Sequence, residues 1–225
     1  MPDENATSFS TNLGQLLATV PTSTWLGLAA KAWRALRKTW NGLVDEGIYE
    51  VLDCEAVLEL KDKRGERALV RKHQRVRFLQ NSVIAFQDQA WGDGDILINY
   101  RCAPGVPVDR YRPGRKTYIL ISLREVKNRG DEEEFDMQWE MHHSFTRSTE
   151  LWSAEVSHRM RHLKLQVTFP RARPPIRVVV VEDTTQKITP LPPDAMRQLP
   201  DGRFTAAWET DRPQLYETYG LRWDW

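Results

Sequence analysis

Two pairs of residues have side chains and spacings that could support a metal ion or a proton transfer. His158 and His162 stand four residues apart, and on a helix they would share a face on which two imidazoles can bind zinc. Glu140 and His142 stand two residues apart, and on a strand the carboxylate could orient the imidazole as a base. Neither pair has the surrounding pattern of a zinc peptidase, and no serine or cysteine stands in a nucleophile motif. We therefore predict no catalytic residue.

Asp88, Asp93 and Asp95 could offer carboxylates to calcium, and the glycines between them would let the backbone turn around an ion. Their spacing is not that of an EF-hand loop. Clusters of glycine and aspartate between strands more often form turns in which the aspartate bonds to its own backbone. The sequence therefore indicates a turn here, and we predict no metal ion and no cofactor.

Four arginines could bind an anionic ligand, because guanidinium groups grip carboxylate and phosphate through paired hydrogen bonds. These candidate anion-binding residues are Arg159, Arg161, Arg171 and Arg173. The last two precede Pro174 and Pro175, which favour a loop. The alternative is a solvated surface whose charge is balanced by nearby glutamate and aspartate.

Residues 24–47 have the pattern of an amphipathic helix, which follows a segment, residues 1–23, that we expect to be flexible. The apolar side carries three tryptophans, Trp25, Trp33 and Trp40, and the opposite side carries four cations, Lys31, Arg34, Arg37 and Lys38. Such a helix can lie in a membrane interface, bind a protein partner, or pack against a sheet. These seven residues are our candidates for partner or membrane binding.

The composition is that of a globular chain of 225 residues, with 28% charged residues and a formal net charge of +1. A nearly neutral chain has no overall field that would attract nucleic acid, so we do not expect a nucleic-acid partner. The sequence shows no secretory signal and no apolar run of membrane-spanning length. We expect a cytoplasmic protein in which Cys54 and Cys102 stay reduced.

From Ile48 onward the sequence alternates between apolar and polar residues, which predicts strands. Around the turn at residues 62–66, a three-residue loop with Gly65 at positive φ would form a hairpin. That loop places Leu58 opposite Val70, Glu55 opposite His73, and Asp53 opposite Arg75. The outer-face charges would then partly neutralise one another.

Roughly ten such strands, with little helical pattern between them, predict a mainly β fold: an antiparallel sandwich, jelly roll or barrel, preceded by the N-terminal helix. We assign residues 48–225 to this domain, with a possible division near residues 148–150. The chain ends in alternating aromatic residues, so we expect Tyr219–Trp225 to dock as a strand.

These features favour a non-enzymatic cytoplasmic binding module, an adaptor or regulatory protein that uses its helix and surface loops for protein contacts. One alternative is a peripheral membrane protein anchored by the helix. Another is a sensor or hydrolase for a small anionic ligand, with a pocket on the charged face among Arg71, His73, Arg75, Glu140 and His142. The oligomeric state stays open.

Overall fold

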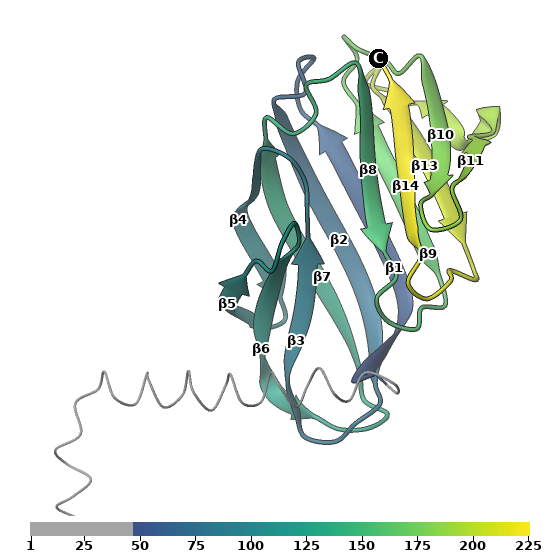
Figure 1. Ribbon diagram of the computed structural model, residues 1–225. Helices are drawn as coiled ribbons and strands as arrows, with labels where there is room; N and C mark the ends of the chain where they lie inside the picture. The colour runs from purple at the N-terminus through teal and green to yellow at the C-terminus, as the bar shows by residue number, and fades with distance from the viewer. Residues whose placement is uncertain (1–46) are drawn as a thin grey trace, which may run out of the picture. The chain divides into compact units, whose positions relative to one another are not determined.

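Residues 47–225, which the computed structural model describes, fold mainly into β-strands (Figure 1). These residues form one compact unit with fourteen strands and one short 3-10 helix, Pro193–Ala195. The predicted mainly β class is confirmed, although the ten strands expected were too few. The seven candidate partner-binding residues of the predicted helix lie in residues 1–46, outside the described part. Within residues 47–225, no helix is long and apolar enough to cross a membrane.

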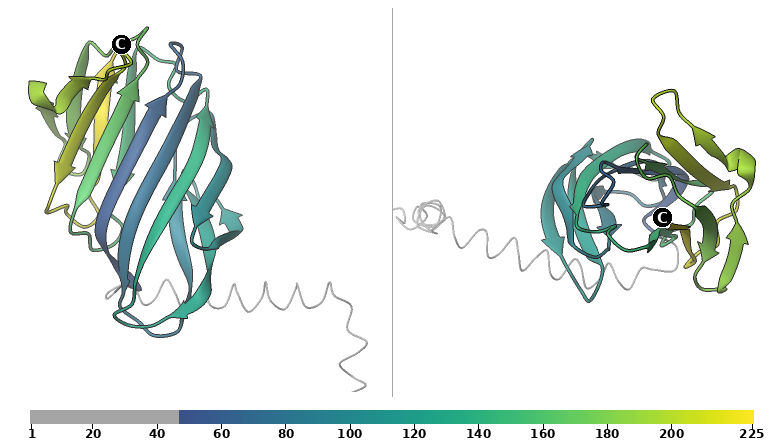
Figure 2. Two further views of the ribbon diagram at one scale, coloured as in Figure 1. Left: turned by 180° about the vertical axis from the view of Figure 1, so that it is seen from behind. Right: turned by 90° about the horizontal axis from the view of Figure 1, so that it is seen from above.

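The largest sheet has seven strands, seen from behind in Figure 2. Their spatial order is β12 (Met196–Gln198), β13 (Phe204–Thr210), β9 (Leu163–Phe169), β1 (Tyr49–Leu60), β2 (Arg67–Phe78), β7 (Glu132–His142) and β4 (Asp95–Ala103). The sheet ends in β12 and β4 rather than closing on itself, so the barrel alternative is wrong. Strands β1 and β9 run parallel, which corrects the prediction of a purely antiparallel fold. The parallel pair arises because the chain crosses to another sheet at β8 before it returns as β9.

Two smaller sheets lie against the inner face of the large sheet, next to different parts of it (Figures 1 and 2). The three-stranded sheet has the order β3 (Val83–Ala90), β6 (Thr117–Lys127) and β5 (Val106–Tyr111). The four-stranded sheet has the order β11 (Lys187–Pro190), β10 (Arg177–Glu182), β14 (Thr218–Asp224) and β8 (Thr149–Glu155). The result is a sandwich of one large sheet against two separate small ones.

Aromatic side chains join these layers. Phe86 of β3 stacks on Phe135 of β7 with ring centroids 4.1 Å apart. Phe169 of β9 meets Trp223 of β14 edge to face at 5.5 Å. Strand β7 shows how the sequence builds this core, since its alternate residues from Phe135 to Met141 are buried while the residues between them face outward. The large sheet therefore has one apolar inner face, which both small sheets cover.

The predicted β1–β2 hairpin has the predicted register. Leu58 pairs with Val70, Glu55 with His73, and Asp53 with Arg75. The turn is fixed by the carboxylate of Asp62, which accepts hydrogen bonds from the backbone N–H groups of residues 64, 66 and 67. The side-chain contacts differ from the backbone pairing. Asp53 and Glu55 bind His162 and Lys164 beside β1 on the β9 side, at 2.6 and 2.7 Å.

Gly65 in this turn has a φ of +73°, as predicted, and its position is also crowded. A Cβ at residue 65 would lie 1.7 Å from the carbonyl oxygen of Phe145, whose N–H donates to the carbonyl of Gly65 at 3.1 Å. Gly65→Ala is therefore expected to lower the free energy of unfolding by about 2 to 3 kcal/mol. Urea denaturation measures this loss. Gly114→Ala is the matched control, since Gly114 has the same φ of +73° with nothing within 4 Å of the added Cβ. Equal losses in the two variants would contradict the steric explanation.

The end of the chain forms β14, as predicted, between β10 and β8 in the four-stranded sheet. Tyr219, Leu221 and Trp223 are buried on its inner face. Beyond the strand, the N–H of Trp225 donates to the carbonyl of Ser148 at 3.0 Å. The last residues of the chain are thus part of the core rather than a tail.

Candidate functional site

The strongest candidate site is a cavity of about 90 Å³ that lies where the two small sheets face each other above the large sheet. Strands β3 and β8 are edge strands of different sheets, and both contribute to its walls. The floor comes from β1, β2 and β7. The cavity exists because β3 and β8 do not pair, so the covering layer is interrupted at this place. Its size allows several water molecules or a small organic group.

The cavity wall includes a buried ion pair between Lys72 of β2 and Asp88 of β3. The side chain of Asp88 is 1% exposed and that of Lys72 is 15% exposed. Asp88 also accepts hydrogen bonds from the hydroxyl of Tyr100 at 2.8 Å and from the N–H of Gln89 at 2.8 Å. Burial, followed by the charge of Asp88 and the hydrogen bond to it, raises the pKa of Tyr100, so its hydroxyl keeps its proton. The network therefore holds one fixed charge pair inside the sandwich.

Two polar groups in the cavity wall lack a partner. Gln74 is 7% exposed, and its side-chain amide makes no hydrogen bond within the described residues. The indole N–H of Trp139, which is buried, also has no acceptor in that part of the chain. The indole N–H of Trp139 is fully enclosed, and a buried polar group without a partner costs about 1 to 3 kcal/mol. The Gln74 amide is not among the fully enclosed unpaired groups, so it faces the open space of the cavity, where it can bind water or a ligand. The cavity thus offers two kinds of free hydrogen-bond donor, the Gln74 amide N–H and the Trp139 indole N–H, and one free acceptor, the Gln74 amide oxygen.

His158 lies at one side of the cavity, stacked on Tyr49 with ring centroids 4.2 Å apart. Its Nδ1 is 3.1 Å from the hydroxyl of Ser157, which in turn accepts a hydrogen bond from the amide of Gln89 at 3.4 Å. Burial lowers the pKa of His158 to about 4. The imidazole is therefore neutral at pH 7 and adds no charge to the cavity.

This lowered pKa predicts a loss of stability in acid. The unfolded chain protonates His158 near pH 6.5, while the folded chain resists until about pH 4. Between these two pH values the unfolded chain binds a proton that the folded chain does not. The free energy of unfolding is therefore unaffected above pH 6.5 and falls by about 2 to 3 kcal/mol as the pH is lowered from 6.5 to 4. Urea denaturation at several pH values measures it. In His158→Phe, which keeps a ring against Tyr49, the decline over this range should be smaller by that amount; curves that run parallel would contradict the assignment.

The cavity reaches the surface beside a second ion pair, between Lys116 before β6 and Glu155 of β8. The ammonium group of Lys116 also lies 5.7 Å from the ring centroid of Trp91. A surface groove of about 510 Å³ shares Trp91, Ser153 and Glu155 with the cavity wall, and Lys116 lines it as well. The Lys116–Glu155 pair therefore stands where cavity and groove meet, and it links the two small sheets.

The four candidate anion-binding arginines do not form one cluster. Arg159 and Arg161 precede β9, whereas Arg171 and Arg173 follow it, so the length of that strand, roughly 20 Å, separates the pairs. Arg161 binds Glu50 at 3.0 Å, and Arg173 lies over the ring of Trp225 at 3.9 Å. Anion binding at either pair stays a prediction.

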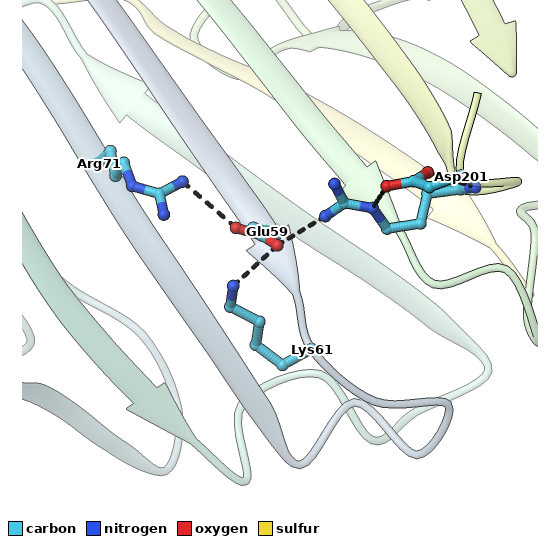
Figure 3. Close-up of polar contacts among 5 residues, drawn as sticks. Glu59, Lys61, Arg71 and Asp201 are labelled. Atoms are coloured by element: carbon cyan, nitrogen blue, oxygen red, sulfur yellow. Dashed lines mark hydrogen bonds and ion pairs between the residues drawn. The ribbon is translucent and has the colours of Figure 1, made fainter. Parts of the chain in front are cut away.

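The charged outer face of the large sheet is tied together by ion pairs. Figure 3 shows its densest group, in which Glu59 meets Lys61 at 2.7 Å and Arg71 at 3.2 Å. Arg203 adds a third contact to Glu59 at 2.7 Å and also binds Asp201 at 2.7 Å. Partial burial alone would raise the pKa of Glu59, but the hydrogen bond from Lys61 and the three neighbouring cations lower it. Acidic partners offset basic residues on this face, as predicted, but the side chain of His73 contacts Asp136 rather than the predicted Glu55.

The other candidate residues also lie apart from the cavity. Arg71, His73 and Arg75 are on the outer face of β2, and none of them lines the cavity. His142 does contact Glu140 at 3.3 Å along β7, also outside the cavity.

The possible metal ligands are likewise separated. His158 and His162 lie in the segment between β8 and β9, not on a helix. Asp88 is buried, whereas Asp93 binds Arg147 at 2.8 Å. Among residues 47–225, no three histidine, cysteine, aspartate or glutamate side chains gather to hold a metal ion.

The sequence carried a signal for the cavity that our interpretation did not use. The alternation that puts Ala68, Val70, Val76 and Phe78 on the inner face of β2 also puts residues 72 and 74 there. Lys72 and Gln74 are thus polar residues in the middle of an apolar face. Such an interruption points to a buried polar site, because polar groups in a core need partners.

Comparisons with known proteins add no assignment to this geometry. No protein-family model matches the chain, and no curated protein is similar to it in sequence. The function must therefore be argued from the cavity itself.

Proposed function

We propose that residues 47–225 form a non-enzymatic binding module that holds a small polar organic molecule in the cavity between the sheets. One observation carries the proposal: the unpartnered amide of Gln74 lines an interior cavity beside the buried Lys72–Asp88 pair. A molecule with both a donor and an acceptor would satisfy groups that the folded chain leaves unsatisfied. The proposal keeps the non-enzymatic binding role of the leading prediction but replaces its protein partner with a small molecule. The small ligand of the alternative prediction was anionic and placed on the charged outer face, whereas the proposed site lies between the sheets.

The energetic cost of this interior supports a functional role. The cavity of about 90 Å³ leaves its lining side chains with fewer packing contacts than a filled core would give them, which lowers the free energy of unfolding. A buried ion pair adds little stability over apolar residues of similar size, and replacing such a pair is often stabilising. Stability is commonly given up at sites that serve binding. The cavity and the buried ion pair both occur at this one place, which favours a ligand site over an ordinary core.

The walls also suit a ligand with an apolar part. Tyr49, Trp91, Trp139 and Trp152 line the cavity together with Met141. Aromatic walls with a few placed polar groups are the usual composition of small-molecule sites, in which the rings provide contact area and the polar groups fix orientation. The adjoining groove of about 510 Å³ extends the space beyond the cavity.

Native mass spectrometry of the full chain, purified without denaturants, tests this function. We expect a small molecule to remain bound and to be released on denaturation. Ala154→Leu, which adds three carbon atoms to a residue of the cavity wall, should abolish retention. Ala207→Leu makes the same change on β13 at a half-buried residue outside the cavity, and it should retain the molecule.

Two results would overturn the proposal. One is a wild-type chain that carries no bound molecule. The other is a bound molecule that Ala154→Leu retains as well as Ala207→Leu does, because the molecule would then lie elsewhere. Thermal denaturation of both variants checks that each is folded.

A further inference from the structure

We propose that the ligand is a primary alkylammonium ion and that Lys116 occupies its ammonium site when the ligand is absent. This inference rests on the proposed function and names its ligand class. It follows from how the chain places its own ammonium groups at the cavity.

Two lysines at this site share one arrangement. Lys72 pairs with Asp88, and its Nζ lies 6.0 Å from the ring centroid of Trp139. Lys116 pairs with Glu155, and its Nζ lies 5.7 Å from the ring centroid of Trp91. When a carboxylate lies beside an aromatic ring, both groups attract a cation: the carboxylate through its negative charge and the ring through its negative face. The cavity and its mouth therefore each contain a built ammonium site, already filled by a lysine.

The charge of the cavity wall also favours a cation. The charged side chains of the wall are Lys72, Asp88 and Glu155, and Lys116 at the mouth pairs with Glu155. The site is therefore balanced while Lys116 is in place, and it carries one net negative charge once the Lys116 ammonium moves away. His158 is neutral at pH 7 because burial lowers its pKa to about 4. An anion that entered would face Asp88 and Glu155, whereas a cation that replaced the Lys116 ammonium would keep Glu155 paired. With Lys116 displaced, the site favours positive charge.

Lys116 is the lysine that a ligand can displace. Its side chain is 36% exposed, against 15% for Lys72, and it borders the open groove. The Lys116 ammonium can therefore move into water, where it regains its hydration. The Lys72–Asp88 pair, held by Tyr100 and closed in by β2 and β3, stays as part of the wall.

Gln74 is the second observation that points to a ligand. It is more than nine-tenths buried, lines the cavity and has no side-chain partner in the described residues. A ligand with its ammonium at Glu155 and an apolar stem among the tryptophans can present a polar group to this amide. Ligand length, set by the distance from mouth to interior, then becomes a source of selectivity.

The test uses the n-butylammonium ion as a probe on the full chain, with neutral 1-butanol as the uncharged comparison. Binding is followed by the NMR signals of the indole N–H groups of Trp91 and Trp139. Lys116→Met removes the competing ammonium and keeps a long apolar side chain, so n-butylammonium should bind about tenfold more tightly than to the wild type. Glu155→Gln added to that variant should reverse the gain. Lys164→Met is the matched control, since Lys164 is a half-buried lysine paired with Glu55 outside the cavity, and it should leave affinity unchanged.

Unchanged or weaker n-butylammonium binding in Lys116→Met would overturn the inference, as would equal binding of 1-butanol. The two proposals fail separately. A neutral or anionic molecule found in the cavity by native mass spectrometry would refute the ammonium class while supporting the binding function. The absence of any retained molecule would count against the binding function itself.

Discussion

Lys72→Met is expected to lower the free energy of unfolding by about 3 to 5 kcal/mol, because it leaves the carboxylate of Asp88 buried without its cation. Tyr100 still donates to Asp88 at 2.8 Å, but a neutral hydroxyl cannot balance a charge in the interior. Replacing both partners, as in Lys72→Met with Asp88→Asn, should recover most of this loss. The asparagine keeps an acceptor for Tyr100 and removes the unpaired charge.

Urea denaturation of the two single variants and the double variant gives the coupling between the residues. Lys164→Met serves as the surface control, since its pair with Glu55 is half exposed and should contribute less than about 1 kcal/mol. A double variant as unstable as Lys72→Met alone would show that the pair is needed for the fold. Recovery would show that the sandwich tolerates an uncharged interior, as expected if the pair serves binding.

Removal of residues 221–225 is expected to abolish cooperative folding. The deletion takes away Leu221 and Trp223, which are 0% and 1% exposed, and interrupts the strand that joins β10 to β8. Loss of a buried tryptophan alone costs about 3 to 5 kcal/mol, which is comparable with the whole stability of many domains.

Circular dichroism and thermal denaturation of the truncated chain measure this effect. Trp223→Phe, which keeps an aromatic ring between Phe145 and Phe169, should fold with reduced stability. A soluble truncated chain with a cooperative thermal transition would contradict the role of β14 as a central strand.

Local patterns in the sequence predicted those parts of the fold that local chemistry determines. The turn around Gly65 fixed the register of β1 and β2, because a short loop and a two-residue side-chain period leave few alternatives. The alternation of apolar and polar residues from Ile48 onward and the aromatic end of the chain predicted strands with one buried face, as β7 and β14 have. Strand β11 (Lys187–Pro190) was missed, since its residues are all exposed and give no such pattern.

Long-range pairing could not be predicted in the same way. The parallel contact between β1 and β9 depends on where β8 lies, and no nearby residue encodes that. The division of the covering layer into two sheets, which creates the cavity, is also a property of the whole topology. The polar residues Lys72 and Gln74 on an apolar face were visible in the sequence, but the position of Asp88 on β3 beside Lys72 was not, nor was the cavity beside Gln74. The four candidate anion-binding arginines show that residues close in sequence can lie far apart. Arg159 and Arg161 are separated from Arg171 and Arg173 by the length of β9.

The central claim is that the cavity beside Gln74 is a ligand site, and the electron density within it tests this most directly. A crystal structure of the full chain, at a resolution that separates water from organic molecules, should show continuous non-water density within hydrogen-bonding distance of the Gln74 amide. In crystals of Ala154→Leu that density should be absent. Isolated water molecules alone in the wild-type cavity, bridging Gln74 to its neighbours, would contradict the account and make the cavity a hydrated part of the core.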